Sequence, residues 1–146
     1  MIIQEIGVKI IENLGKKVSN MIIDACTLSE MVLEIQKSMN KLGVSILEGI
    51  ISDYNKAIKD SSGRKKSWNV VRQDERKIMT PMGEVRIRRD YYRNKNTGEH
   101  AYLLDEALGL AKHDRLDRTM KTELLRQAES VSYEKASKHN NFAPVS

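Results

Sequence analysis

The chain has 146 residues, enough for one domain with a real core or for a small domain plus an arm, but too few for a large enzyme. With 40% hydrophobic and 31% charged residues, its composition argues against global disorder. Its net charge of +5 is concentrated, because residues 59–95 carry 12 Lys/Arg against 5 Asp/Glu and the segments on both sides are slightly acidic. The apolar runs are too short to span a bilayer and the N-terminus lacks the pattern of a signal peptide, so we expect a soluble cytoplasmic protein without membrane contact.

Apolar residues at spacings of three and four predict a first helix over residues 2–25. Thr27 and Glu30 have the spacing of a capping box, which predicts a second helix that begins at Leu28 and stops near Gly63. Gly43 and Gly49 within this second helix indicate a bend or the close approach of another helix. The apolar stripe of the second helix consists of Leu28, Val32, Ile35, Met39, Leu42, Ile46, Ile50, Tyr54 and Ala57.

The two helical stripes can bury each other in an intramolecular hairpin. Their spacing is also close to the seven-residue repeat that seats a partner helix, and we predict that residues 1–63 form a homodimer. The stripe alone does not decide between these two arrangements.

The segment that follows has the features of a β-ribbon. Turn signals at residues 81–84 and 94–98 separate three strand-like runs, for which we predict antiparallel strands near residues 71–80, 84–93 and 100–104. Alternation along the second strand places one set of side chains on a packed face and the other on a polar face that can meet an anion. The packed set is Val85, Ile87 and Tyr91, and the polar set is Arg86, Arg88 and Tyr92.

A further helix is predicted around residues 116–128, with Asp114 as its cap and Asp117 in its first turn. We expect a second, short helix over residues 132–139 that caps the helical bundle, followed by a turn at residues 140–146. The fold class is therefore α+β, with a helical arm (1–63), a basic β-ribbon module (64–110) and a C-terminal helical segment (111–146).

Neither carboxylate pair in the sequence is expected to be catalytic. Asp74 and Glu75 are successive strand residues that point to opposite faces, and Asp105 stands where a cap would precede a helix beginning at Glu106. The single Cys26 permits no internal disulfide. The three histidines are too dispersed to form a zinc site, so we expect no metal and no other cofactor.

The central segment resembles the N-terminal region of the ISLre-type bacterial insertion-sequence transposases, which are distantly similar to Mutator-type transposases. The resemblance is strongest over residues 64–110 and continues more weakly to Ser146. It is carried by Lys66-Ser67-Trp68, Asp74-Glu75-Arg76, Thr80, Gly83-Glu84-Val85, Arg89, Tyr91-Tyr92, Asn94-Lys95, Thr97-Gly98-Glu99, Tyr102-Leu103-Leu104-Asp105-Glu106 and Leu108-Gly109.

This resemblance implies a protein that acts on DNA. In that family a segment like Ser132–Ala136 is the first helix of a helix-turn-helix, and a metal-dependent RNase H-like domain follows later. We therefore expect a truncated helix-turn-helix at the end of this chain and no enzymatic activity. A remnant of a disrupted element, a separate regulator and a truncated reading of a longer frame remain alternatives.

Localised positive charge with interleaved aromatic residues favours contact with nucleic-acid phosphates, so we expect weak DNA binding without sequence preference. The alternative is a non-catalytic helical interaction protein, whose Lys/Arg-rich edge is solvated and only prevents strand aggregation. The predicted DNA contacts are Lys65, Lys66, Arg72, Arg86, Arg88, Arg93 and Lys95.

Overall fold

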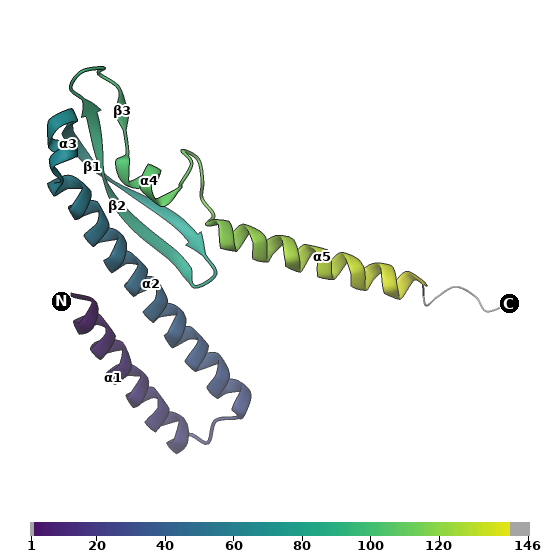
Figure 1. Cartoon of the computed structure of the whole chain (residues 1–146). Coiled ribbons are helices and arrows are strands. Elements are labelled where there is room, and N and C mark those ends of the chain that lie inside the picture. The colour runs from purple at the N-terminus through teal and green to yellow at the C-terminus, as the bar shows by residue number, and fades with distance from the viewer. Residues whose placement is uncertain (1, 141–146) are drawn as a thin grey trace.

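The computed structural model describes residues 2–140 and has the predicted α+β architecture, with long N-terminal helices, a small antiparallel sheet and C-terminal helices (Figure 1). No helix within this range combines the length and the apolar character needed to cross a bilayer. In chain order the elements are α1 (Ile2–Ile23), α2 (Leu28–Asp60), α3 (Ser62–Ser67), β1 (Trp68–Thr80), β2 (Gly83–Asn94), β3 (His100–Ala101), α4 (Leu103–Leu108) and α5 (Arg118–Asn140).

The sheet confirms the predicted ribbon. Its three antiparallel strands lie in the order β1-β2-β3, and the long β1–β2 pair keeps one register from Arg72 to Thr80 after an irregularity at Val71. Gly83 and Gly98 have φ angles of 135° and 73°, backbone conformations that favour glycine, so both turn signals are used as expected. The third strand is shorter than predicted because the chain turns into α4 at Leu103.

The core lies where α2 and α4 meet the ribbon. Ile78, Val85, Ile87 and Leu104 form its buried centre, and the α2 side chains Val44, Leu47 and Ile51 are among those that pack against it. Full burial of one such side chain stabilises the fold by about 1.5–3 kcal/mol. Gly43 is a point of close approach, but the neighbour is a turn and not the helix that the sequence predicted, because a Cβ at that position would collide with the Sδ of Met82 in the β1–β2 turn.

The alternation predicted for β2 holds only for its first half. Val85 and Ile87 are buried while Arg86 and Arg88 are exposed, as expected. Tyr92 is fully buried, so its predicted place on the polar face is wrong. The physical reason is that helices cover this end of β2. The side-chain amide of Asn55 in α2 donates to the Asp90 carboxylate at 2.9 Å, and the guanidinium of Arg64 in α3 lies 5.8 Å from the centre of the Tyr92 ring.

The start of α2 is the predicted capping box. The Thr27 hydroxyl accepts from the amide of Glu30 at 3.3 Å, and the Glu30 carboxylate accepts from the amide of Thr27 at 2.8 Å. The end of α2 differs from the prediction, since Gly63 does not stop the helix. Ser61 ends α2 and its hydroxyl caps α3 through the amide of Arg64, so the expected basic linker is helical.

Of the two arrangements left open for the α2 stripe, mutual burial in the hairpin is found for only a small part of it. α1 and α2 do form a hairpin (Figure 1). The α2 side chain buried beside α1 is Ser38 rather than a member of the stripe. Val32, Ile35 and Met39 stay 56%, 43% and 50% exposed, so a long apolar face remains open along α2. The hairpin is stabilised in part by the ion pair between Lys17 and Glu34, at 3.4 Å.

The C-terminal region departs most from the predictions. The residue that precedes α5 is Asp117 rather than Asp114, and its carboxylate accepts from the amide of Thr119 at 3.0 Å. Asp114 lies in the loop before α5, where its carboxylate accepts from the amide of Ala111. α5 runs without a break through the expected boundary between two helices. It projects away from the ribbon instead of capping the bundle, and its Tyr133 is 78% exposed (Figure 1). Of the turn predicted at residues 140–146, Asn140 belongs to α5, and the other positions lie outside the described residues.

Candidate nucleic-acid interface

The structure separates the seven predicted DNA contacts into two exposed groups and one paired residue. The first group lies where α3 meets the β2–β3 turn. There the Lys95 ammonium donates to the carbonyl of Lys65 at 2.6 Å, and the amide of Lys95 donates to the carbonyl of Ser67 at 2.8 Å. These bonds fix the turn against the helix end and bring together four exposed cations that are separated in sequence. They are Lys65, Lys66, Arg93 and Lys95.

The second group consists of Arg86 and Arg88 on the exposed side of β2. They stand opposite Lys77 and Glu75 of β1 in the strand register. The Glu48 carboxylate of α2 accepts from the backbone amide of Arg86 at 2.9 Å. Both guanidinium groups border a polar hollow of about 360 Å³ whose lining also includes Glu48 and Glu75. This group is accessible, but two carboxylates reduce its positive potential.

Arg72 is engaged within the protein. Its Nε donates to both carboxylate oxygens of Asp74, at 2.9 and 3.2 Å, and its guanidinium lies 4.1 Å from the centre of the Tyr91 ring. The Tyr102 hydroxyl donates to Asp74 at 2.6 Å, and this bond is the main cause of a pKa of Asp74 below its ordinary value. The hydrogen bond to Asp74 raises the pKa of Arg72 in turn. Arg72 is therefore the least available of the predicted contacts.

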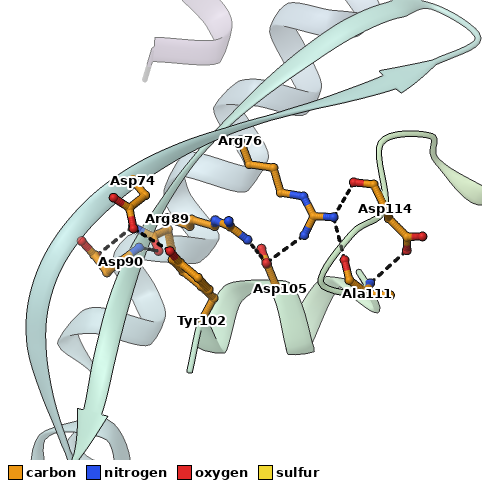
Figure 2. A network of polar contacts seen from close by, with 9 residues as sticks. Asp74, Arg76, Arg89, Asp90, Tyr102, Asp105, Ala111 and Asp114 are labelled. Atoms are coloured by element: carbon orange, nitrogen blue, oxygen red, sulfur yellow. Dashed lines mark hydrogen bonds and ion pairs between the residues drawn. The ribbon is translucent and has the colours of Figure 1, made fainter. Parts of the chain in front are cut away.

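A buried ion cluster lies on the other face of the ribbon (Figure 2). Asp105 of α4 pairs with Arg76 of β1 at 3.0 Å and also with Arg89 of β2. The three side chains are only 9%, 8% and 13% exposed, in that order. Asp105 is therefore a structural residue inside α4, and its predicted role as a helix cap is wrong. The cap position is Tyr102, whose side chain makes no capping bond.

Arg76 connects this cluster to the loop before α5. Its guanidinium also donates to the carbonyls of Ala111, at 2.6 Å, and Asp114, as Figure 2 shows. Arg89 lies 3.7 Å from the centre of the Tyr102 ring, and burial lowers the pKa of its guanidinium. Two cations share one carboxylate, so the cluster keeps one positive charge, and it holds β1, β2, α4 and the loop in a single arrangement.

The carboxylates that sequence analysis considered for catalysis are thus accounted for by contacts. Asp74 is held by Arg72 and Tyr102, and Asp105 by two arginines. Glu75 is exposed, as expected for its opposite direction. Within residues 2–140, no three His, Cys, Asp or Glu side chains come together in a group that could hold a metal ion.

The sequence singled out Arg76 and Arg89 only through the resemblance and did not predict their pairing with Asp105. It also did not predict that the cations of the loop before α5 would form a site. The run Lys112-His113-Asp114-Arg115 was a signal that could have been used. Nearby aspartates lower the net charge of this run, so it does not stand out in the sequence. The fold places it beside β1, where the amide of Met79 donates to the carbonyl of Arg115 at 2.8 Å.

The family model described as "Uncharacterised protein family (UPF0236)" matches residues 21–144. UPF0236 protein TTE2489 of Caldanaerobacter subterraneus subsp. tengcongensis is 36% identical over 111 residues, which are 76% of this chain and 24% of that protein. UPF0236 protein TTE0402 of the same organism is also 36% identical over 111 residues, covering 76% and 23% of the two chains. The chain thus spans about a quarter of the length of the curated relatives it matches. No solved structure matches it.

Proposed function

The chain belongs to the UPF0236 family, and from this premise we propose that it is the DNA-associated N-terminal portion of a transposase of the ISLre type. It binds DNA through backbone phosphates, weakly and without sequence preference, and it acts in the cytoplasm. The observation that carries this proposal is the distribution of charge. Residues 59–95 carry 12 Lys/Arg and 5 Asp/Glu, and the excess positive charge lies on α3 and the ribbon. Most of these cationic side chains are exposed.

Phosphate contact suits this arrangement for a physical reason. A protein that neutralises phosphates releases condensed counterions, and this contribution does not depend on base sequence. Arg88 and Arg93 are five residues apart on β2, which is about 17 Å along an extended strand. Because these positions differ by an odd number, the two side chains leave β2 on opposite faces, and the two exposed groups therefore offer two separate surfaces for phosphate contact. Binding of this kind has a Kd of about 10⁻⁴ to 10⁻⁶ M at physiological salt.

We assign no DNA cleavage to these 146 residues. Cleavage by two metal ions requires several free carboxylates on one rigid fold. Asp74 and Asp105 instead serve arginine side chains in the ribbon. The chemistry of the ISLre-type proteins would then belong to a part of the longer relatives that this chain does not span.

The experiment compares the full chain with Arg86→Ala/Arg88→Ala in fluorescence anisotropy of a labelled duplex between 50 and 200 mM NaCl. Removal of two phosphate contacts should lower affinity and reduce the slope of log K against log salt by about 2. Lys9→Ala/Lys16→Ala on α1 is the matched control, since it removes the same charge from two exposed positions away from the ribbon. The proposal would be refuted if both variants lost the same DNA affinity. It would also be refuted if the parent bound one terminal-repeat sequence much more tightly than other sequences.

A second candidate function, a non-catalytic interaction protein that self-associates, is favoured by the open apolar face of α2. From Leu28 to Ile46 the stripe alternates in steps of four and three, as in a coiled-coil seam. The positions flanking it are uncharged, so a second copy can approach without like-charge repulsion. These flanking residues are Ser29, Met31, Gln36, Ser38, Gly43 and Ser45. Ser38 is buried beside α1 and Gly43 lies against Met82, so the part of the stripe open to a second copy runs from Leu28 to Met39. We assign a second copy of this chain as the occupant.

Light scattering tests this homodimer. The full chain at tens of micromolar should have twice the monomer mass, and Ile35→Glu/Met39→Glu should return it to monomer while the helices stay folded by circular dichroism. Leu125→Glu, at an exposed apolar position of α5, is the control that should leave the mass unchanged. A folded monomeric parent would exclude the homodimer and leave only the intramolecular hairpin.

A further inference from the structure

A second basic site lies at the outer edge of β1, away from the residues proposed above. The loop before α5 folds back along this edge, where the amide of Asp117 donates to the carbonyl of Met79 at 2.9 Å. Between loop and strand is a pocket of about 340 Å³, within the size range of small-ligand sites. Its lining contains six basic residues from three segments, namely Arg76, Lys77, Arg89, Lys112, His113 and Arg115.

The charge of this pocket is only partly compensated. Two acidic residues also line it, Glu75 and Asp114. Asp114 is already used, because its carboxylate accepts from Lys121 at 2.8 Å and from the amide of Ala111 at 2.9 Å. These bonds, with that to Lys121 first, hold the pKa of Asp114 below its ordinary value. Asp114 is therefore paired with Lys121, which does not line the pocket, and Glu75 and Asp114 together are still fewer than the basic residues of the lining.

The floor of the pocket adds to this excess. Arg76 and Arg89 share the single carboxylate of Asp105, which leaves one positive charge in a region almost closed to water. Among the described residues, the Nε of Arg89 and the Oδ1 of Asp105 are both buried and have no hydrogen-bond partner, so the cluster holds one unused donor and one unused acceptor beside its excess positive charge. A buried cation with an unused donor is costly, because its lost hydration is not replaced. An anion in the pocket would supply the missing compensation.

We propose that this pocket holds a phosphate group of the DNA backbone, with Lys112 and Arg115 as its direct contacts and the Arg76–Arg89 pair as its positive floor. The inference rests on the proposed function, to which it adds a binding site. A phosphodiester carries one negative charge and several acceptor oxygens, which suits a pocket lined by guanidinium and ammonium groups.

The position of the pocket supports a DNA source for the phosphate. Arg86 of β2 stands directly opposite Lys77 of β1, and Lys77 in turn lines a hollow together with Arg115 of the loop. Glu84 also lines this hollow and pairs with Lys77 at 3.5 Å, so it offsets part of the charge there. Neighbouring strands are about 4.8 Å apart. The three cations therefore form a row across the ribbon, from the exposed Arg86 and Arg88 group to the pocket, and a nucleic-acid backbone can follow that row from one site to the other.

Two measurements on the full chain test the site. In the first, inorganic phosphate is titrated while the NMR signals of the His113 ring are followed, with chloride at equal ionic strength as the control. In the second, DNA affinity is measured against salt for Lys112→Ala/Arg115→Ala, Arg86→Ala/Arg88→Ala and the α1 control Lys9→Ala/Lys16→Ala. We expect a saturable phosphate shift that only the Lys112/Arg115 variant removes. The same variant should reduce the DNA salt slope by about 2.

The possible failures are distinguishable. A His113 response to phosphate no larger than that to chloride overturns the pocket, whatever the DNA measurement gives. A phosphate response together with unchanged DNA binding by the Lys112/Arg115 variant overturns the assignment to DNA, since the pocket then takes a free phosphate. A parent that binds phosphate at His113 but no DNA at low salt overturns both the DNA assignment and the proposed function.

Discussion

The most consequential contact for stability is the sharing of Asp105 by two arginines, and its removal gives a quantitative prediction. Asp105→Ala deletes a carboxylate that is 9% exposed and pairs with Arg76, at 3.0 Å, and Arg89. Breaking a buried ion pair by removing one partner costs about 3–5 kcal/mol, because the remaining charge is left without compensation. A domain of this size is stable by only about 5–15 kcal/mol, so the loss should be a large part of the total.

The two arginines should not contribute equally to this loss. Arg76 keeps the loop carbonyls of Ala111 and Asp114 as acceptors after Asp105 is removed. Arg89 loses the carboxylate, and its Nε already lacks a partner within the described part of the chain. Adding Arg89→Met to Asp105→Ala should therefore recover about 1 kcal/mol or more, since a methionine leaves no buried charge.

Urea unfolding followed by circular dichroism measures these free energies of unfolding. Glu106→Ala is the matched control, because this neighbouring carboxylate in α4 is exposed and should change stability by less than about 0.5 kcal/mol. A loss below about 1 kcal/mol for Asp105→Ala would refute the structural role of the cluster. A double variant less stable than Asp105→Ala would show that Arg89 is not the residue left without a partner.

Three further predictions concern the arm, the ribbon and the absence of catalysis. Thr27→Ala removes the α2 capping box and should lower the free energy of unfolding by about 1 kcal/mol, as measured by urea titration, whereas Ser29→Ala should not. The pKa of Asp74 is lower in the folded chain than its ordinary value of 3.8. The contribution of Asp74 to the free energy of unfolding is therefore complete above pH 3.8, and it is lost as the pH falls through the folded pKa. The urea concentration at the unfolding midpoint should therefore decrease as the pH is lowered through this range, and it should decrease less in Asp74→Asn. With Mg²⁺ or Mn²⁺ the purified chain should neither cleave nor join duplex DNA in a gel assay, and metal-dependent cleavage that Asp105→Asn abolishes would contradict this.

Local patterns in the sequence were sufficient for the elements themselves. The capping box at Thr27 and Glu30 marks the start of α2 because it depends only on residues three apart. The turns before Gly83 and at Gly98 likewise depend on φ angles that glycine tolerates, so the hairpin could be read without knowledge of its surroundings. Alternation in β2 predicted the burial of Val85 and Ile87 for the same reason.

Tertiary structure decided which faces are covered. The stripe of α2 is apolar throughout, yet α1 and the ribbon cover other sides of the helix and leave Val32 and Met39 exposed. Periodicity identifies an apolar face but does not state which element packs on it. The prediction that Tyr92 lies on the polar face was wrong because helices cover that end of β2. The alternation of residues along a strand contains no information about a covering helix.

The charge clusters were also decided by the fold. Asp105 follows a turn and resembles a cap in sequence, but it is the acceptor for arginines 29 and 16 residues away. Lys112 and Arg115 reach β1 only because the loop folds back along its edge. A sequence therefore determines how much charge each segment carries, whereas contacts between distant segments determine which charges are paired and which remain available to an anion.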